Sequence, residues 1–427
     1  MITSLYALYL KNRSVQTDTR KLSAGQIFFA LKGPQFNGNS FARQALDAGA
    51  DAVVIDEDQG ISDPRVFLVE DALKTLQDLA AYHRLQLKIP FLAITGSNGK
   101  TTTKELVNTV LSTTYKTSTT VGNLNNHIGV PLTILAIPPD TKIAVIEMGA
   151  NHQKEIEGYC EYTRPTHGLI TNCGKAHLEG FGGEEGVRKG KGELYDFLRS
   201  NEGTAFVMWD YDYFHDMSKG IPHIVTYGTH DAEYSGEALL SEPYLHVRMR
   251  GGTTITDIHT QLVGDYNLPN ILAAVTVGEY FKVPAQKISA AIESYQPTNS
   301  RSQLMEKNGN TFILDAYNAN PSSMKLAIEN FNKQHHPNKY VCIGGMMELG
   351  AESILEHERV IEQLDQSHWT NVILVGNDFS KVKHSYSYFP DSDSAAQAIK
   401  SMNIKDGMFL IKGSRSMRME NIMKAFE

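Results

Sequence analysis

The sequence predicts an α/β protein in three parts: a small N-terminal α/β domain, a central P-loop domain with a parallel sheet, and a C-terminal Rossmann-like, doubly wound domain. Three observations support this. The chain has 427 residues, and roughly 100–200 residues per domain corresponds to about two to four domains. Short apolar runs alternate with helix-compatible segments over most of the chain, as in parallel sheets covered by helices. A glycine-bearing turn directly follows one of these runs. We expect the domains to span residues 1–88, 89–298 and 299–427.

The N-terminal domain is predicted from four segments. Residues 27–33 (IFFALKG) are an apolar run that ends in a glycine turn, and residues 51–56 (DAVVID) have the composition of a buried strand. Apolar residues at helical spacing predict helices over 41–50 and 71–87. These segments predict a small α/β fold.

The central domain begins with a buried-type strand at 91–95 (FLAIT), and a helix is expected over 102–113. Residues 222–262 are short, polar and β-branched, which predicts a small antiparallel excursion before a helix at 268–281. Alternation of strands with helices predicts a parallel sheet covered on both faces. Its other predicted strands are 142–149, 167–172 and 203–209.

The C-terminal domain repeats the alternation of strands and helices, which predicts a second doubly wound fold. A linker is expected at 294–301 (SYQPTNSR). The predicted strands are 311–317, 340–345, 371–376 and 407–413.

Composition narrows the class of protein. Hydrophobic residues make up 41% and charged residues 21%, as in ordinary soluble globular proteins. A net charge of −8 argues against a dedicated nucleic-acid binder, and no run reaches the ~18 apolar residues of a membrane span. The three cysteines have no CxxC spacing, which disfavours disulfides and structural zinc. With an N-terminus that lacks a charged signal-peptide region, these features predict a cytoplasmic protein without membrane insertion.

The most informative segment is the turn after the strand at 91–95, with sequence GSNGKTT over 96–102. Gly96 and Gly99 allow the backbone to approach an anion, and a helix N-terminus attracts negative charge. Lys100 is suited to the β- and γ-phosphates, and the Thr101 hydroxyl to Mg²⁺. The strict P-loop pattern has glycine where Ile94 stands. An ordinary glycine-rich turn is the alternative, but the segment favours binding of a nucleoside triphosphate with a metal.

Other polar residues follow predicted strands or begin predicted helices, where ligands of open α/β sheets bind. Glu147 ends one strand and suits Mg²⁺, although a solvated glutamate is the alternative. His177 is in a loop, where a histidine is more often structural. Asp315, Tyr317, Asn318 and Asn320 surround a helix start, and helix capping explains part of this cluster. Capping is also expected to explain at least one of Asn267 and Asn270.

These segments, taken in order, resemble the Mur ligase family. The resemblance covers essentially the whole chain. YNANP together with MMELGAES is typical of one branch, which joins D-alanyl-D-alanine to UDP-N-acetylmuramoyl-tripeptide. The segments that carry the resemblance are TDTRKLSAGQIFFALKG, ITGSNGKTTTKE, GNLNNHIGVPLTIL, IEMGANHQKEIE, TNCGKAHLEGFGG, KGKGELYDFL, LDAYNANPSSM, GGMMELGAES and LIKGSRSMRME.

The resemblance implies a role for each matching residue. Lys100, His177 and Lys191 match catalytic positions, and Lys191 matches a lysine that the family carries as a carbamate. Thr101, Glu147 and His177 match the Mg²⁺ site. The ATP positions are Gly96, Ser97, Asn98, Gly99, Lys100, Thr101, Thr102, Asn267, Asn270, Arg301 and Asp315. The substrate positions are Thr19 and Arg20 on the uridine side, with Asn126, Tyr317, Asn318, Asn320 and Lys412.

The resemblance also implies an activity. It is an ATP- and Mg²⁺-dependent amide ligase that acts through an acyl phosphate in peptidoglycan precursor synthesis, and so in cell-wall biogenesis, cell shape and cell division. A monomer is expected. The alternatives are another Mur-type or folylpolyglutamate-synthase-like ligase with a different amine, or a P-loop nucleotide switch. The sequence departs from the family at His127, at Gly345 and over 36–41 (FNGNSF), where acidic or DGHDF-like residues are usual.

Overall fold

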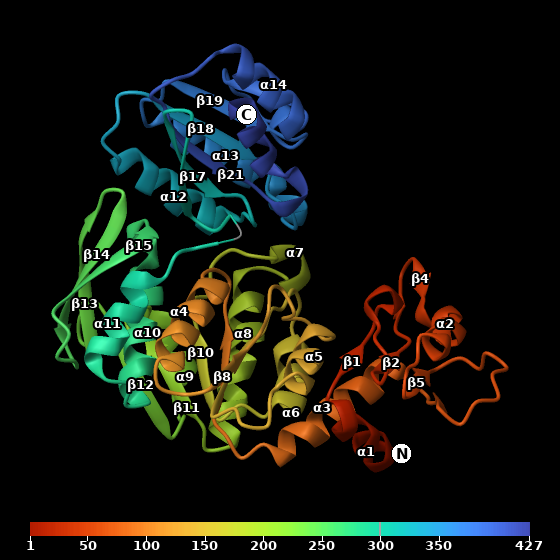
Figure 1. Ribbon diagram of the computed structural model, residues 1–427. Helices are drawn as coiled ribbons and strands as arrows, with labels where there is room; N and C mark the ends of the chain where they lie inside the picture. The colour runs from red at the N-terminus through yellow and green to blue at the C-terminus, as the bar shows by residue number, and fades with distance from the viewer. Residues whose placement is uncertain (299) are drawn as a thin grey trace.

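The computed structural model describes residues 1–298 and 300–427. It contains three main sheets, and we call each sheet with its helices the N-terminal, central or C-terminal unit (Figure 1). The α/β class predicted from the sequence is confirmed. The bounds 1–88, 89–298 and 299–427 stay predictions, and residue 299 of the predicted linker lies outside the described residues.

The N-terminal unit has a four-stranded parallel sheet in the order β1-β2-β5-β6, and a two-stranded hairpin, β3–β4. The sequence analysis located the strand at 51–56 and the helices at 41–50 and 71–87, and it missed the first helix of the chain. The elements are α1 (Ile2–Asn12), β1 (Val15–Gln16), β2 (Ile27–Phe29), β3 (Lys32–Gly33), β4 (Phe36–Asn37), α2 (Ala42–Asp47), β5 (Ala52–Ile55), β6 (Val66–Leu68) and α3 (Ala72–Gln86).

The central unit has a nine-stranded sheet in the order β15-β14-β13-β12-β11-β10-β7-β9-β8. The elements are β7 (Phe91–Thr95), α4 (Lys100–Ser112), β8 (Thr117–Thr119), α5 (Gly129–Leu135), β9 (Ile143–Glu147), α6 (Glu155–Thr163), β10 (His167–Ile170), α7 (Leu178–Phe181), α8 (Glu184–Ser200), β11 (Thr204–Met208), α9 (Asp212–Ser218), β12 (His223–Gly228), β13 (Tyr234–Ser241), β14 (Tyr244–Gly251), β15 (Asp257–Val263), α10 (Leu268–Tyr280) and α11 (Ala285–Ser294).

The prediction of a small antiparallel excursion over 222–262 is partly wrong. β12 pairs in parallel with β11, and β13 begins in parallel with β12, so both continue the main sheet. Only β13–β14 and β14–β15 are antiparallel. The strands at this end of the sheet lack the continuous apolar run that marks a doubly covered parallel strand.

The C-terminal unit has a six-stranded sheet in the order β16-β17-β21-β18-β19-β20, which is parallel except for the edge strand β16. All four predicted strands are present. The elements are β16 (Gln303–Lys307), β17 (Asn310–Asp315), α12 (Pro321–Lys333), β18 (Lys339–Gly344), α13 (Ser353–Asp365), β19 (Asn371–Val375), β20 (Ser387–Phe389), α14 (Ser392–Ser401) and β21 (Met408–Lys412).

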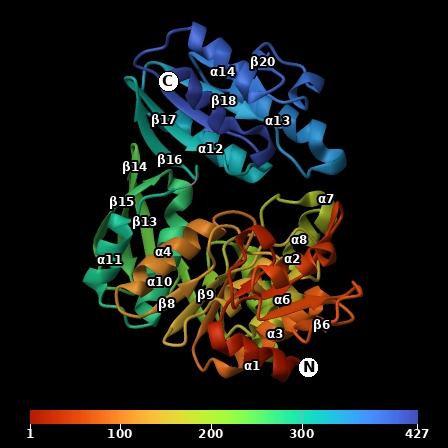
Figure 2. The same ribbon diagram turned by 45° about the vertical axis from the view of Figure 1, so that its right-hand side comes forward.

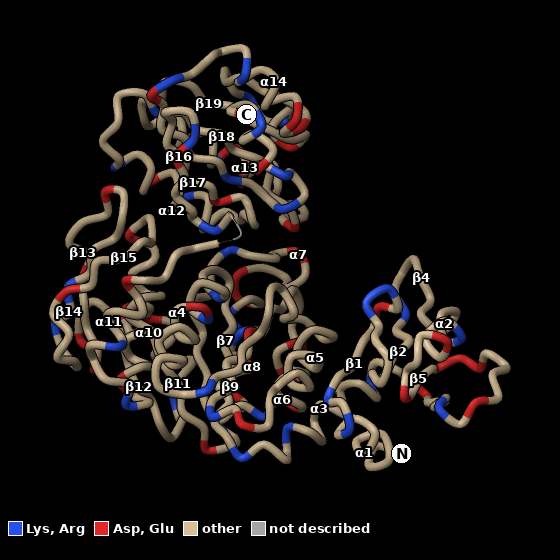
Figure 3. Tube along the Cα trace, in the orientation of Figure 1, with Lys and Arg blue, Asp and Glu red and all other residues tan. Residues whose placement is uncertain are grey.

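The central unit lies between the other two units (Figure 1). The C-terminal unit lies beyond the end of the central sheet near α7, and the N-terminal unit lies beside α5 and α6 (Figures 1 and 2). Lysines and arginines are interspersed with acidic residues along all three units (Figure 3). Among the described residues, we find no helix with both the length and the apolar character needed to cross a bilayer.

The N-terminal unit is fastened to the central unit by buried polar contacts. The Tyr9 hydroxyl donates to the carbonyl of Leu135 (2.7 Å). The Arg84 guanidinium donates to the carbonyls of Thr163 (2.7 Å) and Arg164 (2.9 Å), and lies 3.8 Å from the Phe91 ring centroid. These donors satisfy carbonyls at the ends of α5 and α6. Apolar residues of the two units also form one continuous core.

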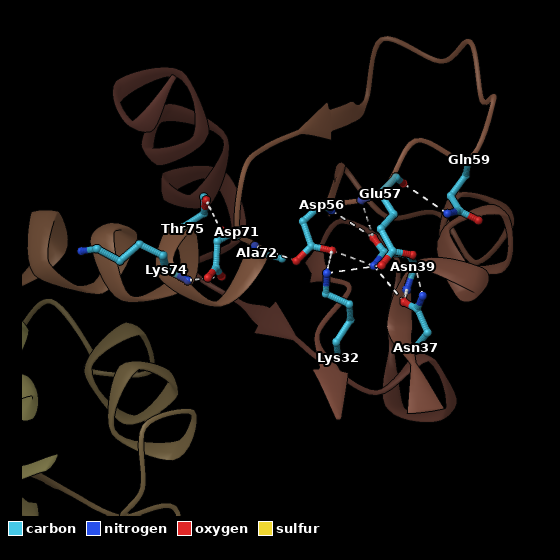
Figure 4. A network of polar contacts seen from close by, with 10 residues as sticks. All are labelled: Lys32, Asn37, Asn39, Asp56, Glu57, Gln59, Asp71, Ala72, Lys74 and Thr75. Atoms are coloured by element: carbon cyan, nitrogen blue, oxygen red, sulfur yellow. Dashed lines mark hydrogen bonds and ion pairs between the residues drawn. The ribbon is translucent and has the colours of Figure 1, made fainter. Parts of the chain in front are cut away.

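A buried asparagine organises the side of the N-terminal unit that carries the β3–β4 hairpin (Figure 4). The Asn39 amide donates to Asn37 Oδ1 (2.8 Å) and Asp56 Oδ1 (2.7 Å). Its oxygen accepts from the backbone amides of Asp56 (3.0 Å) and Glu57 (3.3 Å). Burial acts to raise the pKa of Asp56, but hydrogen bonds from Asn39 and Ala72 and the Lys32 ammonium hold it below its usual value. Asn39 therefore ties the hairpin to the end of β5.

We expect Asn39→Ala to destabilise the N-terminal unit by about 1–3 kcal/mol, because the partly buried backbone amides of Asp56 and Glu57 lose their acceptor. Ser40→Ala is the control, since the exposed Ser40 hydroxyl makes one bond, to the carbonyl of Asn37. Urea unfolding followed by tyrosine fluorescence measures both variants. Equal stability of Asn39→Ala and the parent would contradict this role of Asn39.

Candidate active site

A cavity of about 920 Å³ lies between the carboxyl edge of the central sheet and the C-terminal unit. Residues predicted separately from the two halves of the chain meet on its walls. The predicted residues that line it are Ser97, Asn98, Gly99, Lys100, Thr101, Thr102, Asn126, Glu147, His177, Asn267, Asn270, Arg301, Asp315, Tyr317, Asn318, Asn320 and Lys412.

The phosphate loop joins β7 to α4 at the floor of this cavity. Gly96 has φ +140°, and a Cβ there would lie 2.0 Å from the Thr171 hydroxyl oxygen. Gly99 is the N-cap of α4 with φ +78°, and no side chain caps the helix. Residues 99–102, which form this first turn, line the cavity. The helix N-terminus is thus open to an anion.

Asn172 holds the loop in place. Its carbonyl accepts from the Ser97 amide (2.9 Å), and its side-chain oxygen accepts from the Asn98 amide (3.0 Å). These bonds fix the loop before any ligand binds. Sequence analysis did not select Asn172, although its place directly after β10, at the sheet edge, was a usable signal.

Lys100 lies folded over its own loop. Its ammonium donates to the carbonyls of Gly96 (2.7 Å) and Ser97 (3.0 Å). Removal from water lowers the pKa of Lys100 to about 8, with the Glu147 carboxylate acting in the opposite direction and Arg301 in the same one. A polyphosphate in the cavity would offer this cation stronger acceptors than two carbonyls.

Glu147 is the buried carboxylate beside the loop. Its Oε1 accepts from the Thr101 hydroxyl (3.1 Å) and from Asn125 Nδ2 (2.7 Å), and its buried Oε2 has no hydrogen-bond partner among the described residues. A buried carboxylate oxygen without a partner is costly, and a hard cation satisfies it. Asn125 was missed because its neighbour Asn126 was selected instead. Asn126 accepts from two backbone amides of its own turn.

Two further residues support Glu147 from behind. The Glu147 amide donates to the Thr120 hydroxyl (2.9 Å), and the fully buried Lys104 donates to the Thr120 carbonyl (2.6 Å). Lys104 lies on α4, so the same helix carries Lys100 of the phosphate loop and the lysine that bonds Thr120 behind Glu147. Nothing in the local sequence pattern distinguishes Lys104 from a surface lysine.

His177 is turned toward the C-terminal unit. It has φ +52° at the start of α7, and its Nδ1 is hydrogen-bonded to the Glu348 carboxylate. Within residues 1–298 and 300–427, three or more His, Cys, Asp or Glu side chains do not gather in a metal-ligating group. The structure therefore brings Thr101 and Glu147 together, and gives His177 a different partner.

Lys191 is buried on α8 behind the cavity and does not line it. Its ammonium donates to the Ala150 carbonyl (2.9 Å) and lies 4.8 Å from the Phe181 ring centroid. Burial, followed by the charge of Lys100, lowers the pKa of Lys191 to about 7. Lys189, two residues earlier, is exposed and pairs with Glu185 (3.0 Å). Composition does not separate these two lysines; the family resemblance selects Lys191, and the structure shows that Lys191 is the buried one.

Asn267 and Asn270 lie at the start of α10, but neither caps the helix, contrary to the sequence-based expectation. Asn267 donates to the carbonyl of Val263 (2.9 Å), and Asn270 donates to Asn267 Oδ1 (2.8 Å). Asn270 Oδ1 accepts from the Thr103 hydroxyl (3.0 Å) and lies close to Gly99. Neither side chain caps α10 because Asn267 bonds to the preceding strand at Val263 and Asn270 bonds to Asn267 and to Thr103 on α4.

The C-terminal unit provides the opposite wall. Lys412 pairs with Asp315 (2.5 Å) across neighbouring strands, and the Arg301 guanidinium lies 3.6 Å from the Tyr317 ring centroid. Asn320 caps α12 as predicted, accepting from the Ser323 amide (2.9 Å). The Asn318 side chain accepts from its neighbour's amide. This wall presents the cations Arg301 and Lys412 and several polar side chains to the cavity.

Thr19 and Arg20 do not reach this cavity. They form a 3-10 turn in the N-terminal unit, where the exposed Arg20 pairs with Asp18 (2.8 Å).

Two of the positions that depart from the family pattern lie in the central and C-terminal units. His127 is exposed on the cavity rim. A Cβ at Gly345 would lie 3.3 Å from Asp378 Oδ2, so an aspartate there would face another carboxylate.

Comparison with known proteins defines the class. Family models described as "Mur ligase family, catalytic domain", "Mur ligase middle domain" and "Mur ligase, glutamate ligase domain" match residues 12–90, 94–278 and 300–415. The chain belongs to the Mur ligase family, and it is a ligase.

The similar curated proteins share one specific ligase name. The chain is 33% identical to UDP-N-acetylmuramoyl-tripeptide--D-alanyl-D-alanine ligase of Bacillus subtilis (strain 168), with 96% of this chain and 92% of the relative covered. It is 34% identical to the ligase of the same name from Escherichia coli (strain K12), with 97% and 93% covered.

Solved structures agree with this assignment. MurF from Acinetobacter baumannii has a TM-score of 0.88 at 30% identity over 97% of this chain and 93% of its own. MurF ligase from Thermotoga maritima in complex with ADP has a TM-score of 0.88 at 26% identity over 98% and 97%.

We expect Lys100→Ala to lower ligation by at least about 100-fold, or roughly 2.7 kcal/mol, because the cation next to the transferring phosphate is lost. Thermal unfolding should stay near that of the parent. Lys142→Ala, at an exposed position of the same sheet, is the control. Activity of Lys100→Ala within tenfold of the parent at saturating ATP would refute the assignment of this loop.

Proposed function

We propose that this chain is the ATP-dependent ligase that joins D-alanyl-D-alanine to UDP-N-acetylmuramoyl-tripeptide in peptidoglycan precursor synthesis. The observation that carries the proposal is the single cavity in which the phosphate loop, Glu147 and the C-terminal cations Arg301 and Lys412 converge. The end-to-end similarity to relatives with this activity supports the choice of substrates. Another amine substrate for the same ATP machinery is the alternative.

The chemistry follows from the charge of the reactants. A carboxylate does not condense with an amine at neutral pH, so the terminal carboxylate of the tripeptide first takes the γ-phosphoryl group of ATP. This gives an acyl phosphate and ADP. The amine of D-alanyl-D-alanine then attacks the carbonyl carbon, the amide bond forms, and inorganic phosphate and a proton leave. Positioning and charge neutralisation account for most of such catalysis.

Each group of the cavity has a part in this proposal. Lys100 binds the β- and γ-phosphates once it exchanges its two carbonyl acceptors for phosphate oxygens. Arg301 and Lys412 face the phosphates from the C-terminal side, and Asn267 and Asn270 lie on the adenine side. The C-terminal unit covers the cavity and excludes water, which would otherwise hydrolyse the acyl phosphate.

The residues fit Mg²⁺. Glu147 has a buried oxygen without a partner, and the Thr101 hydroxyl is next to its other oxygen. These two residues would hold the ion, with His177 as a further ligand once it leaves Glu348. When bound, Mg²⁺ offsets the negative charge that collects on the phosphate oxygens.

Lys191 fits a carbamate. Carbon dioxide reacts with a neutral amine, and burial gives Lys191 a pKa of about 7, where an ordinary lysine is almost wholly protonated. A carbamate nitrogen keeps one N–H, which suits the bond to the Ala150 carbonyl. The modified side chain would turn a buried cation into an anion beside Lys100. Uridine binding by Thr19 and Arg20, a cytoplasmic location and a monomeric state stay predictions.

The proposed function predicts that phosphate release from ATP requires both UDP-N-acetylmuramoyl-tripeptide and D-alanyl-D-alanine. A coupled phosphate assay with each substrate omitted in turn measures this, and mass spectrometry identifies the product. Product formation with a single amino acid, such as L-alanine or D-glutamate, but not with the dipeptide would assign the chain to another branch of the family. ATP turnover that ignores both substrates would favour a nucleotide switch.

For Lys191, we expect alkylation trapping followed by peptide mass analysis to find a carbamate at Lys191 and not at Lys189. The trapped fraction should increase as the pH rises through about 7, because the neutral amine then predominates. Lys191→Ala should lose most activity, partly restored by acetate or formate, whereas Lys189→Ala should retain it. An unmodified Lys191 together with full activity of Lys191→Ala would exclude this role.

A further inference from the structure

The segment that follows β10, residues 171–175, lies between the phosphate loop and the C-terminal unit; we call it the β10 strap. On the loop side, the Thr171 hydroxyl donates to the Asn98 carbonyl (2.5 Å), and the Ser97 hydroxyl donates to the Gly174 carbonyl (2.8 Å). The strap thus contacts the two loop residues that precede Gly99. Any movement of the strap would move the loop with it.

On its other side, the strap touches the C-terminal unit through Lys175. The Lys175 amide donates to the Ser322 hydroxyl (2.9 Å), and its ammonium donates to Glu356 Oε1 (2.9 Å). A Cβ at Gly174 would lie 2.9 Å from the Ser322 hydroxyl, so the two units approach closely here. Next to this contact, Asn320 donates to Asn98 Oδ1 (2.7 Å). The C-terminal unit therefore contacts both the strap and the loop.

The partner of Lys175 is a carboxylate in an unusual place. The Glu356 side chain is only 4% exposed, and its other ion-pair partner is Arg359 on the same helix, α13. A buried carboxylate that loses a partner is costly. Lys175 belongs to the central unit. It therefore offsets the buried charge of Glu356 only while the central and C-terminal units are in contact.

A second ion pair between the units gives a contrast. Lys333 on α12 pairs with Asp265 (2.6 Å), but the two side chains are 60% and 37% exposed. Exposed pairs contribute little, since water already solvates both charges. The Lys175–Glu356 pair is the more buried of the two and the one attached to the phosphate loop.

We propose that Lys175 is a positioning residue that, by pairing with Glu356, holds the C-terminal unit in register over the phosphate loop. The proposal rests on the proposed function, and it assigns a part in that reaction to a residue that contacts neither the loop's phosphate-binding amides nor Glu147. Loss of the pair favours a more open arrangement, in which Asn320 leaves Asn98 and the cavity admits water.

The test is a double-mutant cycle on the full chain with Lys175→Met, Glu356→Gln and the combined variant. We expect each single change to lower kcat about tenfold or more, as for a broken buried ion pair. The combined variant should lose no more than about twofold beyond the worse single variant, because both changes remove one interaction. Lys175→Arg should retain most activity, since a guanidinium can also pair with the carboxylate. Lys333→Met should stay within about twofold of the parent.

Small-angle X-ray scattering with saturating ADP provides a readout that needs no ligation. The radius of gyration should increase in both single variants and in the combined variant, and match the parent in Lys333→Met. Thermal unfolding checks that each variant folds. If Lys175→Met does not fold, Glu356→Gln and Lys175→Arg decide the question.

Parental rates and scattering in the single variants, or losses that multiply in the combined variant, would overturn the proposal. A parent enzyme that forms no product from the proposed substrates would instead overturn the proposed function. The scattering comparison would still decide whether the pair holds the two units together.

Discussion

The close approach of the phosphate loop to the end of β10 is the constraint on which the rest of the site depends. A side chain at residue 96 would collide with the Thr171 hydroxyl, and only glycine tolerates this position with its positive φ. Because the turn is this tight, Asn172 can bond the loop amides of Ser97 and Asn98. The first turn of α4 is then left uncapped and faces the cavity. The anion site is built before any anion arrives.

Buried charge is the second feature that the fold must support. Removal from water lowers the pKa of both Lys100 and Lys191, and the charge of Lys100 lowers the pKa of Lys191 further. Glu147 retains a buried oxygen without a partner. Such groups cost stability in the absence of a ligand. The large apolar core of the central unit, continuous with that of the N-terminal unit, makes this cost tolerable. Lys100 and Glu147, which line the cavity, are then available to a polyphosphate and its cation.

The C-terminal unit contributes through contacts of two kinds. Arg301, Asp315 and Lys412 extend the polar wall of the cavity, while Asn320 and the Lys175–Glu356 pair join the unit to the phosphate loop and its strap. Arg301, Asp315 and Lys412 are suited to bind a ligand. Asn320 and the Lys175–Glu356 pair determine where these three residues lie relative to the phosphate loop. A fold with three units can thus assemble a site from segments that are more than 200 residues apart in the chain.

The sequence by itself determined the α/β class, the main parallel strands of the central and C-terminal sheets and the identity of the phosphate loop, but not the edge strands β8, β16 and β20. These depend on local signals: apolar runs of strand length, glycines in a turn, and a lysine and threonine directly after them. It was less successful where strands lack a continuous apolar run, as at β12 and β13, whose parallel pairing has no periodic signature. It also expected side-chain capping by at least one of Asn267 and Asn270, whereas the side chain of Asn267 at the N-cap makes no capping bond.

Only the tertiary structure decided which of two neighbouring lysines is buried, that Glu147 has a free oxygen, and that His177 faces Glu348. Burial and pairing are properties of the neighbours a residue acquires from distant segments, and one residue's chemistry does not encode them. Lys189 and Lys191 are the same amino acid two positions apart, but α8 turns one toward water and the other toward Ala150 and Phe181. A helix places residues two positions apart on different faces. The core that covers one of those faces forms only when the whole unit folds.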